Sequence, residues 1–167
     1  HTDDIFCARG TEEVVIPGRV MRVPIVVLAD ESAMDVAAVY MPCRGTREGG
    51  EAWAALSEWV YTRKDLVLAG DMNASVARDD AKRTPSDTAL RELVDEGILE
   101  VVSKVGCTYA RAGTALDYWL ATPDCAWRWE SGEIRKGVSD HEAVEVQYDR
   151  ELIMRRHVER SRFRAER

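Results

Sequence analysis

A short apolar run, Leu66 to Ala69, stops abruptly at Gly70 and is followed at once by Asp71 and Asn73. A run of this length that ends at a turn residue predicts a buried β-strand. Side chains two residues apart on an extended backbone point the same way. The Asp71 carboxylate and the Asn73 amide are therefore expected to lie together, just past the C-terminal end of the strand.

Two interpretations of this Gly-Asp-Met-Asn segment are open. Asp and Asn are favoured turn residues, so one interpretation is a strand followed by an Asx turn with no further role. The other is chemical, because Asp offers a hard oxygen ligand or a proton acceptor and Asn offers N–H donors to a phosphoryl oxygen. The tetrapeptide alone favours the turn, so the rest of the chain has to decide between them.

The N-terminal part of the chain predicts strands that neighbour this run. Residues 19–28 and 35–41 are rich in Val, Ile and Met and are separated by a polar stretch, so they predict a β-hairpin. Residues 14–16 predict one further short strand. The hairpin brings Tyr40 to the end of its second strand, as the apolar run brings Asp71 to the end of its own.

Two amphipathic helices are predicted. The first covers residues 51–64, after a break at the Gly-Gly pair 49–50, and carries its apolar residues at helical spacing. The second is capped by Ser86 or Asp87 and runs to Glu96. Both helices are expected to pack their apolar faces into a core.

The segments outside these helices are a charged loop and several short strands. The loop, residues 74–85, includes Arg78 and is either solvated or in contact with the backbone of a substrate. Short strands are predicted over residues 98–102, 108–110, 115–121, 126–133 and 143–148, and a basic helix over 150–165. Several strands with two intervening helices predict a mixed α/β layered domain.

Composition narrows the class of protein. The net charge of −7 argues against a protein that coats nucleic acid, although residues 150–167 hold seven Arg against three Glu. A divalent cation can screen an acidic site, so phosphodiester cleavage is not excluded. Four scattered cysteines without a C-x-x-C pair argue against a zinc site. No apolar run approaches the roughly 20 residues of a membrane helix, so no membrane partner is expected.

Polar side chains stand at four predicted strand ends or turns: Tyr40, Asp71 with Asn73, Asp117, and Asp140 with His141. Asp117 lies between apolar residues, where an acid needs a partner. It is either a structural ion-pair or hydrogen-bond partner, or a carboxylate that orients a histidine. Of the three histidines, His1, His141 and His157, only His141 lies in a site-like context, directly before a predicted strand.

Four segments taken together resemble one known group of proteins. They are Val39-Tyr40-Met41-Pro42, Gly70-Asp71-Met72-Asn73, Leu116-Asp117-Tyr118-Trp119-Leu120 and Ser139-Asp140-His141. Their order and spacing resemble the endonuclease/exonuclease/phosphatase superfamily, over a stretch from about Gly18 to Tyr148. That superfamily includes apurinic/apyrimidinic endonucleases, pancreatic-type deoxyribonucleases, inositol-phosphate phosphatases and the endonuclease domains of non-LTR retrotransposons. Thr108-Tyr109 followed by the Leu-Asp-Tyr strand is most similar to the retrotransposon and apurinic/apyrimidinic branches.

The resemblance implies an α/β fold, a four-layer sandwich of two mostly antiparallel sheets flanked by helices. Residues 1–148 would form the domain, as its C-terminal three-quarters, and residues 149–167 a basic helical tail or linker. The superfamily also uses an Asn near the end of its first strand and a metal-binding Glu further along, both upstream of the tyrosine motif. No Asn precedes Asn73, and Glu12 and Glu13 lack that context. We therefore expect a domain truncated at its N-terminus and without its principal metal-ligand Glu.

The resemblance also implies catalytic roles. His141 would contact the scissile phosphate, and Asp117 would fix the tautomer and orientation of its ring. Asp71 would align or deprotonate the attacking water, or assist the leaving group. Asn73 would hydrogen-bond a phosphate oxygen, and Tyr40 would support the phosphate or the water.

A metal ion completes the implied site. Asp140 would be its carboxylate ligand, and Mg²⁺, or Mn²⁺ in its place, would act as Lewis acid. Loss of the upstream Glu would weaken metal binding, since a Mg²⁺ site usually rests on one or two protein carboxylates.

The expected function is a metal-dependent phosphodiesterase, a DNA endonuclease of retroelement type. Its partner would be DNA, with a reverse transcriptase domain downstream in a longer polyprotein and an intracellular, nuclear location. Two alternatives stay open. One is a phosphatase of the same superfamily, which would need a compact cationic pocket. The other is a catalytically incomplete domain that acts as a binding module.

Overall fold

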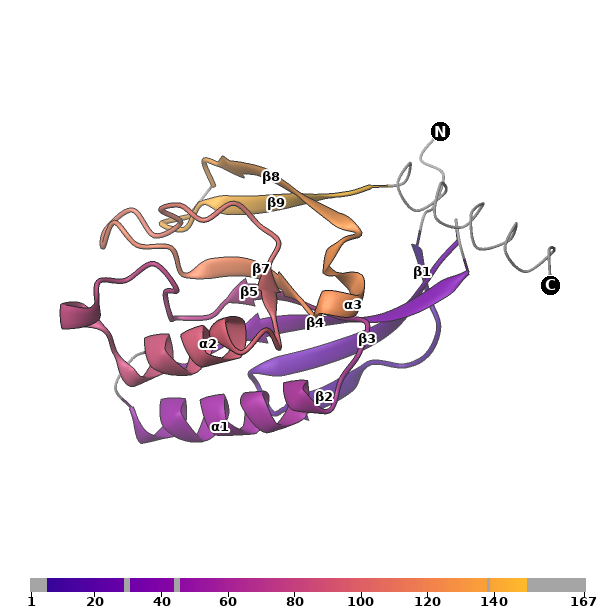
Figure 1. Ribbon diagram of the computed structural model, residues 1–167, viewed down its shortest axis with the longest axis horizontal. Helices are drawn as coiled ribbons and strands as arrows, with labels where there is room; N and C mark the ends of the chain where they lie inside the picture. Colours follow the sequence, from indigo (N-terminus) through magenta and orange to yellow (C-terminus); the bar gives the residue numbers. More distant parts are fainter. Residues whose placement is uncertain (1–5, 29–30, 44–45, 138, 150–167) are drawn as a thin grey trace.

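The computed structural model describes residues 6–28, 31–43, 46–137 and 139–149 (Figure 1). The strands are β1 (Phe6–Ala8), β2 (Glu13–Ile16), β3 (Val20–Val27), β4 (Ser32–Tyr40), β5 (Leu66–Asp71), β6 (Glu100–Val101), β7 (Asp117–Ala121), β8 (Trp129–Arg135) and β9 (Ala143–Tyr148). The helices are α1 (Arg47–Tyr61), α2 (Pro85–Asp95) and the short α3 (Pro123–Ala126), with a 3-10 turn at Asp80–Lys82. The basic helix predicted over 150–165 lies outside the described residues.

Seven strands form one large sheet in the order β1-β3-β4-β5-β7-β6, and β2 also pairs with β3. Within the described chain, β4 and β5 are the one parallel pair, and α1 supplies the crossover that parallel strands require. A second sheet consists of the antiparallel pair β8 and β9. The predicted hairpin is confirmed as β3 and β4 and the predicted short strand as β2, whereas β1 was not predicted.

The large sheet carries a hydrophobic core on each face. On β5, Leu66 and Leu68 belong to the cluster that packs against α1 and α2, and the intervening Val67 belongs to the cluster on the opposite face. The helices α1 and α2 lie on one side of the sheet and the β8-β9 pair on the other (Figure 1). The described residues therefore form helix, large-sheet and small-sheet layers, as expected for two mostly antiparallel sheets. A helical layer outside the small sheet is not found among these residues.

The first helix begins earlier than predicted, because α1 starts at Arg47 and passes through Gly49 and Gly50. Glycine disfavours a helix interior, so the Gly-Gly pair predicts a break. Here Gly49 lies in the first turn, where its N–H donates to the Thr46 side-chain oxygen at 3.0 Å. A Cβ on Gly49 would lie 3.1 Å from that oxygen, so a glycine suits the tight cap.

The second helix is capped by Thr84, not by Ser86 or Asp87 as predicted. The Thr84 hydroxyl accepts a hydrogen bond from the Asp87 N–H at 3.3 Å, and the Asp87 carboxylate accepts one from the Thr84 N–H at 2.7 Å. This capping box leaves Pro85 at the first helical position, where its missing N–H costs no hydrogen bond. The helix ends before Gly97, whose φ of +69° suits glycine.

The strand predicted over residues 143–148 is confirmed as β9, whereas two other predicted strands have different bounds. The strand expected over residues 126–133 begins only at Trp129, because α3 occupies the preceding segment and Trp127 forms its C-cap. The strand expected over 108–110 is reduced to bridges that Tyr109 makes with Thr114 and with His141. None of the helices in the described ranges is long and apolar enough to cross a membrane.

Candidate active site

Three adjacent strands carry predicted site residues in one row. Tyr40 at the end of β4 is in register with Asp71 at the end of β5, and Asp71 is in register with Asp117 at the start of β7. Residues in register on neighbouring strands point to the same face of a sheet. The sheet therefore places these three side chains next to one another.

Gly70 allows β4 and β5 to approach each other directly before this row. Its φ is +141°, and a Cβ built on it would lie 2.0 Å from the carbonyl oxygen of Val39 on β4. A side chain of any kind would collide with that strand, so only glycine fits. The glycine before Asp71 is therefore a requirement of the sheet as well as a turn signal.

The segment after Gly70 forms the turn that the first interpretation predicts. Asn73 has a φ of +46°, and its backbone N–H donates to Asp71 Oδ1 at 2.8 Å, which is an Asx turn. Asn73 Nδ2 also donates to Asp71 Oδ2 at 3.1 Å and to the Met41 carbonyl at 2.9 Å. The two side chains lie together as predicted, but the cause is this turn and not an extended backbone.

His141 is hydrogen-bonded to Asp117, as the second interpretation of Asp117 required. His141 Nδ1 lies 2.8 Å from Asp117 Oδ2. A carboxylate can only accept, so Nδ1 carries the proton and Nε2 is left for another partner. The Tyr109 ring packs against the imidazole with 4.9 Å between ring centroids. The imidazole of His141 is thus held by the Asp117 carboxylate at Nδ1 and by the Tyr109 ring that packs against it.

Thr108 holds both halves of this pair, a role that the sequence analysis missed. Its buried hydroxyl accepts hydrogen bonds from the backbone N–H groups of Leu116 at 2.9 Å and Asp117 at 3.1 Å. Its carbonyl accepts one from the N–H of Glu142, the residue after His141, at 2.7 Å. A single Thr in a polar stretch carries no local pattern that indicates such contacts.

The site opens into a pocket of about 480 Å³. Its lining residues are Tyr40, Cys43, Asp71, Asn73, Tyr109, Ala112, Leu116, Asp140 and His141. Asp140 is exposed on this wall, and its Oδ2 lies 3.9 Å from Arg111 Nε. The described lining contains no Lys or Arg, so His141 is the basic side chain that faces the pocket.

Two groups of the site have raised pKa values. Burial is the main cause that raises the pKa of Asp71, and repulsion from the neighbouring Asp117 acts in the same direction. The hydrogen bond to Asp117 is the main cause that raises the pKa of His141. Both shifts favour the protonated forms, as expected where two carboxylates and an imidazole are crowded together.

The same groups can hold a divalent cation. Ligand atoms of Asp71, Asp117 and His141 all lie within 4.8 Å of one another. The two carboxylates supply the oxygen ligands that Mg²⁺ or Mn²⁺ prefers, whereas His141 is engaged with Asp117 through its protonated Nδ1. Asp140 is not in this group in the described part of the chain, so its role as a metal ligand stays a prediction.

The fold and the site together define a member of the endonuclease/exonuclease/phosphatase superfamily, as the sequence motifs predicted. Within it, the model of the family described as endonuclease-reverse transcriptase matches residues 34–145, and the chain belongs to this family. Members of the superfamily are hydrolytic enzymes that include nucleases and phosphatases, and they use divalent metals. No curated protein matches this chain.

Several solved structures share the fold. The endonuclease domain of TRAS1, a telomere-specific non-LTR retrotransposon, matches with a TM-score of 0.57 and 18% identity, over 79% of this chain and 64% of that domain. An endonuclease/exonuclease/phosphatase protein from Bacteroides vulgatus matches with a TM-score of 0.56 and 14% identity, over 88% and 68%. A mannosyl-6-phosphatase from Bacteroides thetaiotaomicron matches with 0.54 and 12%, over 87% and 67%. The chain spans less than two thirds of the TRAS1 domain, and identities this low show the fold alone.

Proposed function

We propose that this chain is a metal-dependent phosphodiesterase that cleaves DNA, as part of a retroelement endonuclease. The observation that carries the proposal is the hydrogen bond between Asp117 and His141, which stands beside Asp71 in an open pocket. The likeness to the TRAS1 endonuclease domain supports DNA as the substrate. The family description supports a reverse transcriptase domain in the same polyprotein.

His141 would stabilise charge on the scissile phosphate. Its Nδ1 is bound to Asp117, so its Nε2 can donate to a phosphate oxygen. The raised pKa of His141 extends the pH range in which this donor is positively charged. A charged donor placed where negative charge develops lowers the barrier of the reaction. Asp117 contributes by fixing the ring and by raising that pKa.

Asp71 would act on the attacking water. Burial raises its pKa, which makes it a better proton acceptor than an ordinary carboxylate. General-base assistance of this kind is worth about 10²–10⁴-fold in rate. Tyr40, which is 53% exposed on the pocket wall, would hydrogen-bond the water or the phosphate.

Asn73 would act chiefly by holding Asp71. Both N–H groups of its amide already donate, one to Met41 and one to Asp71. The predicted hydrogen bond from Asn73 to a phosphate oxygen would require one of these bonds to open. We therefore assign Asn73 to the placement of the Asp71 carboxylate, with a direct contact to substrate as a secondary role.

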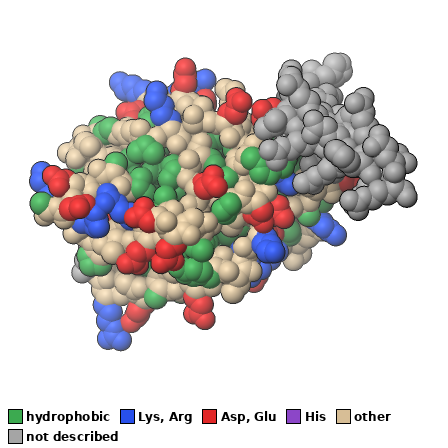
Figure 2. Space-filling model, in the orientation of Figure 1, with side chains coloured by type: hydrophobic (Ala, Val, Ile, Leu, Met, Phe, Trp, Pro, Cys, Tyr) green, Lys and Arg blue, Asp and Glu red, His purple; other side chains and the backbone are tan. Residues whose placement is uncertain are grey.

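Asp71 and Asp117 would hold the metal ion, with the predicted Asp140 beside them. When bound, Mg²⁺ or Mn²⁺ supplies a Lewis acid for the phosphoryl oxygen and offsets the negative charge of the carboxylates. Without a cation, the negative charge of these carboxylates would repel a polyanionic substrate such as DNA. On the face drawn in Figure 2, acidic and basic side chains of the described residues are interspersed and form no continuous basic stripe.

A phosphatase is the second candidate within the same superfamily. It is supported by the fold shared with the mannosyl-6-phosphatase. A phosphomonoester carries more negative charge than a diester, and the described pocket lining supplies only His141 against Asp71 and Asp140. The charge of the pocket therefore favours the diester.

Nicking of supercoiled plasmid in Mg²⁺ or Mn²⁺ tests the proposal. We expect nicking by the wild-type chain that stops with a chelator and falls at least about 10²-fold in Asp71→Ala and in His141→Ala. Glu51→Ala, an exposed change on α1, is the matched control and should cut like the wild type. Cleavage of a phosphomonoester but not of plasmid would favour the phosphatase. DNA binding without any cleavage would favour the binding module.

A further inference from the structure

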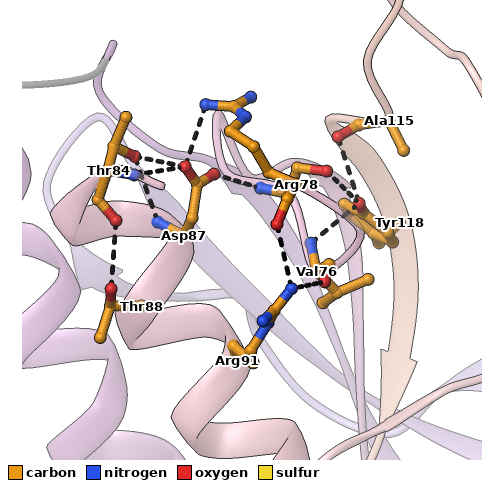
Figure 3. Close-up of polar contacts among 9 residues, drawn as sticks. Val76, Arg78, Thr84, Asp87, Thr88, Arg91, Ala115 and Tyr118 are labelled. Atoms are coloured by element: carbon orange, nitrogen blue, oxygen red, sulfur yellow. Dashed lines mark hydrogen bonds and ion pairs between the residues drawn. The ribbon is translucent and has the colours of Figure 1, made fainter. Parts of the chain in front are cut away.

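A buried carboxylate accepts hydrogen bonds from several residues of the loop that follows the Gly-Asp-Met-Asn segment (Figure 3). Asp87, in the first turn of α2, is fully buried and accepts four hydrogen bonds. The donors are the Ser75 N–H at 2.6 Å, the Thr84 N–H and hydroxyl, both at 2.7 Å, and Arg78 Nη1 at 2.9 Å. These donors span the loop from its beginning to its end. One carboxylate therefore fixes the path of the chain that leaves Asn73.

The ion pair of Arg78 with Asp87 is expected to add little to the free energy of unfolding. Its side chains are 7% and 1% exposed, so both charges are removed from water. The cost of desolvation commonly cancels the attraction in such a pair, and apolar replacements are often as stable. The Asp87 carboxylate, with its four donors, instead selects one geometry for the loop, although Arg78 Nη2 is buried without a hydrogen-bond partner among the described residues. The charged loop 74–85 was expected to be solvated or to contact the backbone of a substrate. Asp79, Asp80 and Lys82 are exposed, whereas Arg78 is buried in this ion pair.

Tyr118 connects the same loop to β7. Its hydroxyl accepts a hydrogen bond from the Val76 N–H at 3.4 Å and donates one to the Ala115 carbonyl at 3.1 Å. The residue is 1% exposed. It directly follows Asp117, so the two side chains point to opposite faces of the sheet. A displacement of Tyr118 in the helix-side core would therefore move Asp117 in the site.

We propose that Arg78, Asp87 and Tyr118 are positioning residues, which hold Asn73 and Asp117 in place from the helix side of the large sheet. Asn73 is restrained because the next backbone groups, at Ser75 and Val76, are bonded to Asp87 and Tyr118. Asp117 is restrained because Tyr118 follows it on β7. The effect on catalysis rests on the proposed function, whereas the effect on the placement of the backbone does not.

A purely structural role for these residues predicts something different. In that case their replacement lowers the melting temperature but leaves the site unchanged in molecules that remain folded. Val60→Ala supplies the comparison, because Val60 is fully buried in the same helix-side core but lies on α1, outside the hydrogen bonds described above. It should destabilise the fold through a cavity alone.

Amide hydrogen exchange, measured by NMR on the full chain well below its melting temperature, tests the placement directly. The probes are the N–H groups of Asn73 and Asp117, which donate to Asp71 Oδ1 and to the Thr108 hydroxyl. We expect at least about tenfold faster exchange at Asn73 in Arg78→Met and at both probes in Tyr118→Phe. Arg78→Lys, which keeps the charge, should restore most of the protection. Exchange no faster than in Val60→Ala would overturn the proposal.

Kinetics on the same variants separate this proposal from the proposed function. If the wild type nicks DNA, Tyr118→Phe should lower kcat by about tenfold and leave KM within about twofold, because the reacting groups are misplaced but the substrate surface is intact. An unchanged kcat alongside faster exchange would overturn the catalytic part. If the wild type does not nick DNA, the proposed function fails, and the exchange result alone decides the placement. Should Arg78→Met not fold, Tyr118→Phe carries the test.

Discussion

Asp117 is the neighbour with the largest effect on the electrostatic properties of His141. The His141 side chain is 29% exposed, and the hydrogen bond to Asp117 is the largest cause of its raised pKa. The chain contains two other histidines, His1 and His157, and neither lies in the described residues. The proposed contact of His141 with a phosphate therefore rests on the environment of this one imidazole, and not on the number of histidines.

Replacing Asp117 with Asn removes this charge and keeps the shape of the side chain. A pKa raised in the folded state means that the bond stabilises the fold fully below the ordinary histidine pKa of 6.5, and less as pH rises through the raised value. We expect the melting temperature of Asp117→Asn to be about 1–3 °C below wild type near pH 5.5. Near pH 9 it should equal or exceed wild type, because Asp71 then loses a like-charged neighbour. Circular dichroism melts check this, and a deficit independent of pH would contradict it.

At the scale of elements, β5 determines where the site lies. It is the strand on which the parallel pair with β4 and the antiparallel pair with β7 meet, so its last residue, Asp71, has a registered neighbour on each side. Gly70 makes this close approach possible. A change at that glycine should therefore disturb the sheet as well as the turn.

Gly70→Ala tests this directly, because its Cβ would meet the Val39 carbonyl oxygen at 2.0 Å and its φ of +141° disfavours any side chain. We expect a loss of at least about 3 kcal/mol in the free energy of unfolding. Gly50→Ala is the control, since nothing lies within 4 Å of its Cβ and it occupies a helix. That change should be neutral or stabilising by about 0.5–1 kcal/mol. Urea denaturation of both variants measures the free energy of unfolding, and equal values for the two would refute the role of Gly70.

Much of this element structure could be predicted from local patterns. The strand at β5, the β3-β4 hairpin and the two helices all follow from apolar periodicity and turn residues within short windows. Helix starts could not be located as well, because a cap depends on one side-chain hydrogen bond. Thr84 and Ser86 are both acceptable caps by type, and only the structure shows which one bonds Asp87.

For the site, the candidate residues could be predicted from the sequence, but the contacts between them could not. Asp71, Asn73, Asp117 and His141 are candidates because they stand at predicted strand ends or turns, and the resemblance to a known superfamily supplies their expected roles. Nothing local predicts that Asp117 reaches His141, which lies on a separate segment and is brought close by the sheet. Contacts such as those of Thr108 depend on tertiary structure alone, and no spacing in the sequence encodes them.

At the scale of the whole molecule, the large sheet leaves apolar side chains open next to the site. Val14, Met21, Ala38 and Ala69 are in register across β2, β3, β4 and β5, and they line a pocket of about 460 Å³ that Tyr40 also borders. Val14 is 61% exposed and Met21 44%. Exposed apolar groups that lie together favour association between molecules.

Met21→Lys should therefore reduce self-association of the chain without loss of stability, since Met21 is an exposed position and such changes typically stay within about 0.5 kcal/mol. Val105→Lys is the matched control, because Val105 is also 44% exposed and the change in charge is the same. Sedimentation velocity over a range of concentrations measures the effect. An equal effect of both substitutions would show that added charge, and not this apolar row, controls association.

The site residues lie on distant segments of the chain, and this determines the order in which folding brings them together. The hairpin β3-β4 and the crossover to β5 join neighbouring parts of the chain, so they can form early and bring Tyr40 and Asp71 together. Asp117 and His141 join them only when β7 pairs with β5 and the loop before β9 closes over it. Late closure of long loops is the slow step in such topologies. A growing or half-folded polypeptide therefore holds two separate halves of the acid–imidazole cluster, and the proposed activity would appear only when folding is complete.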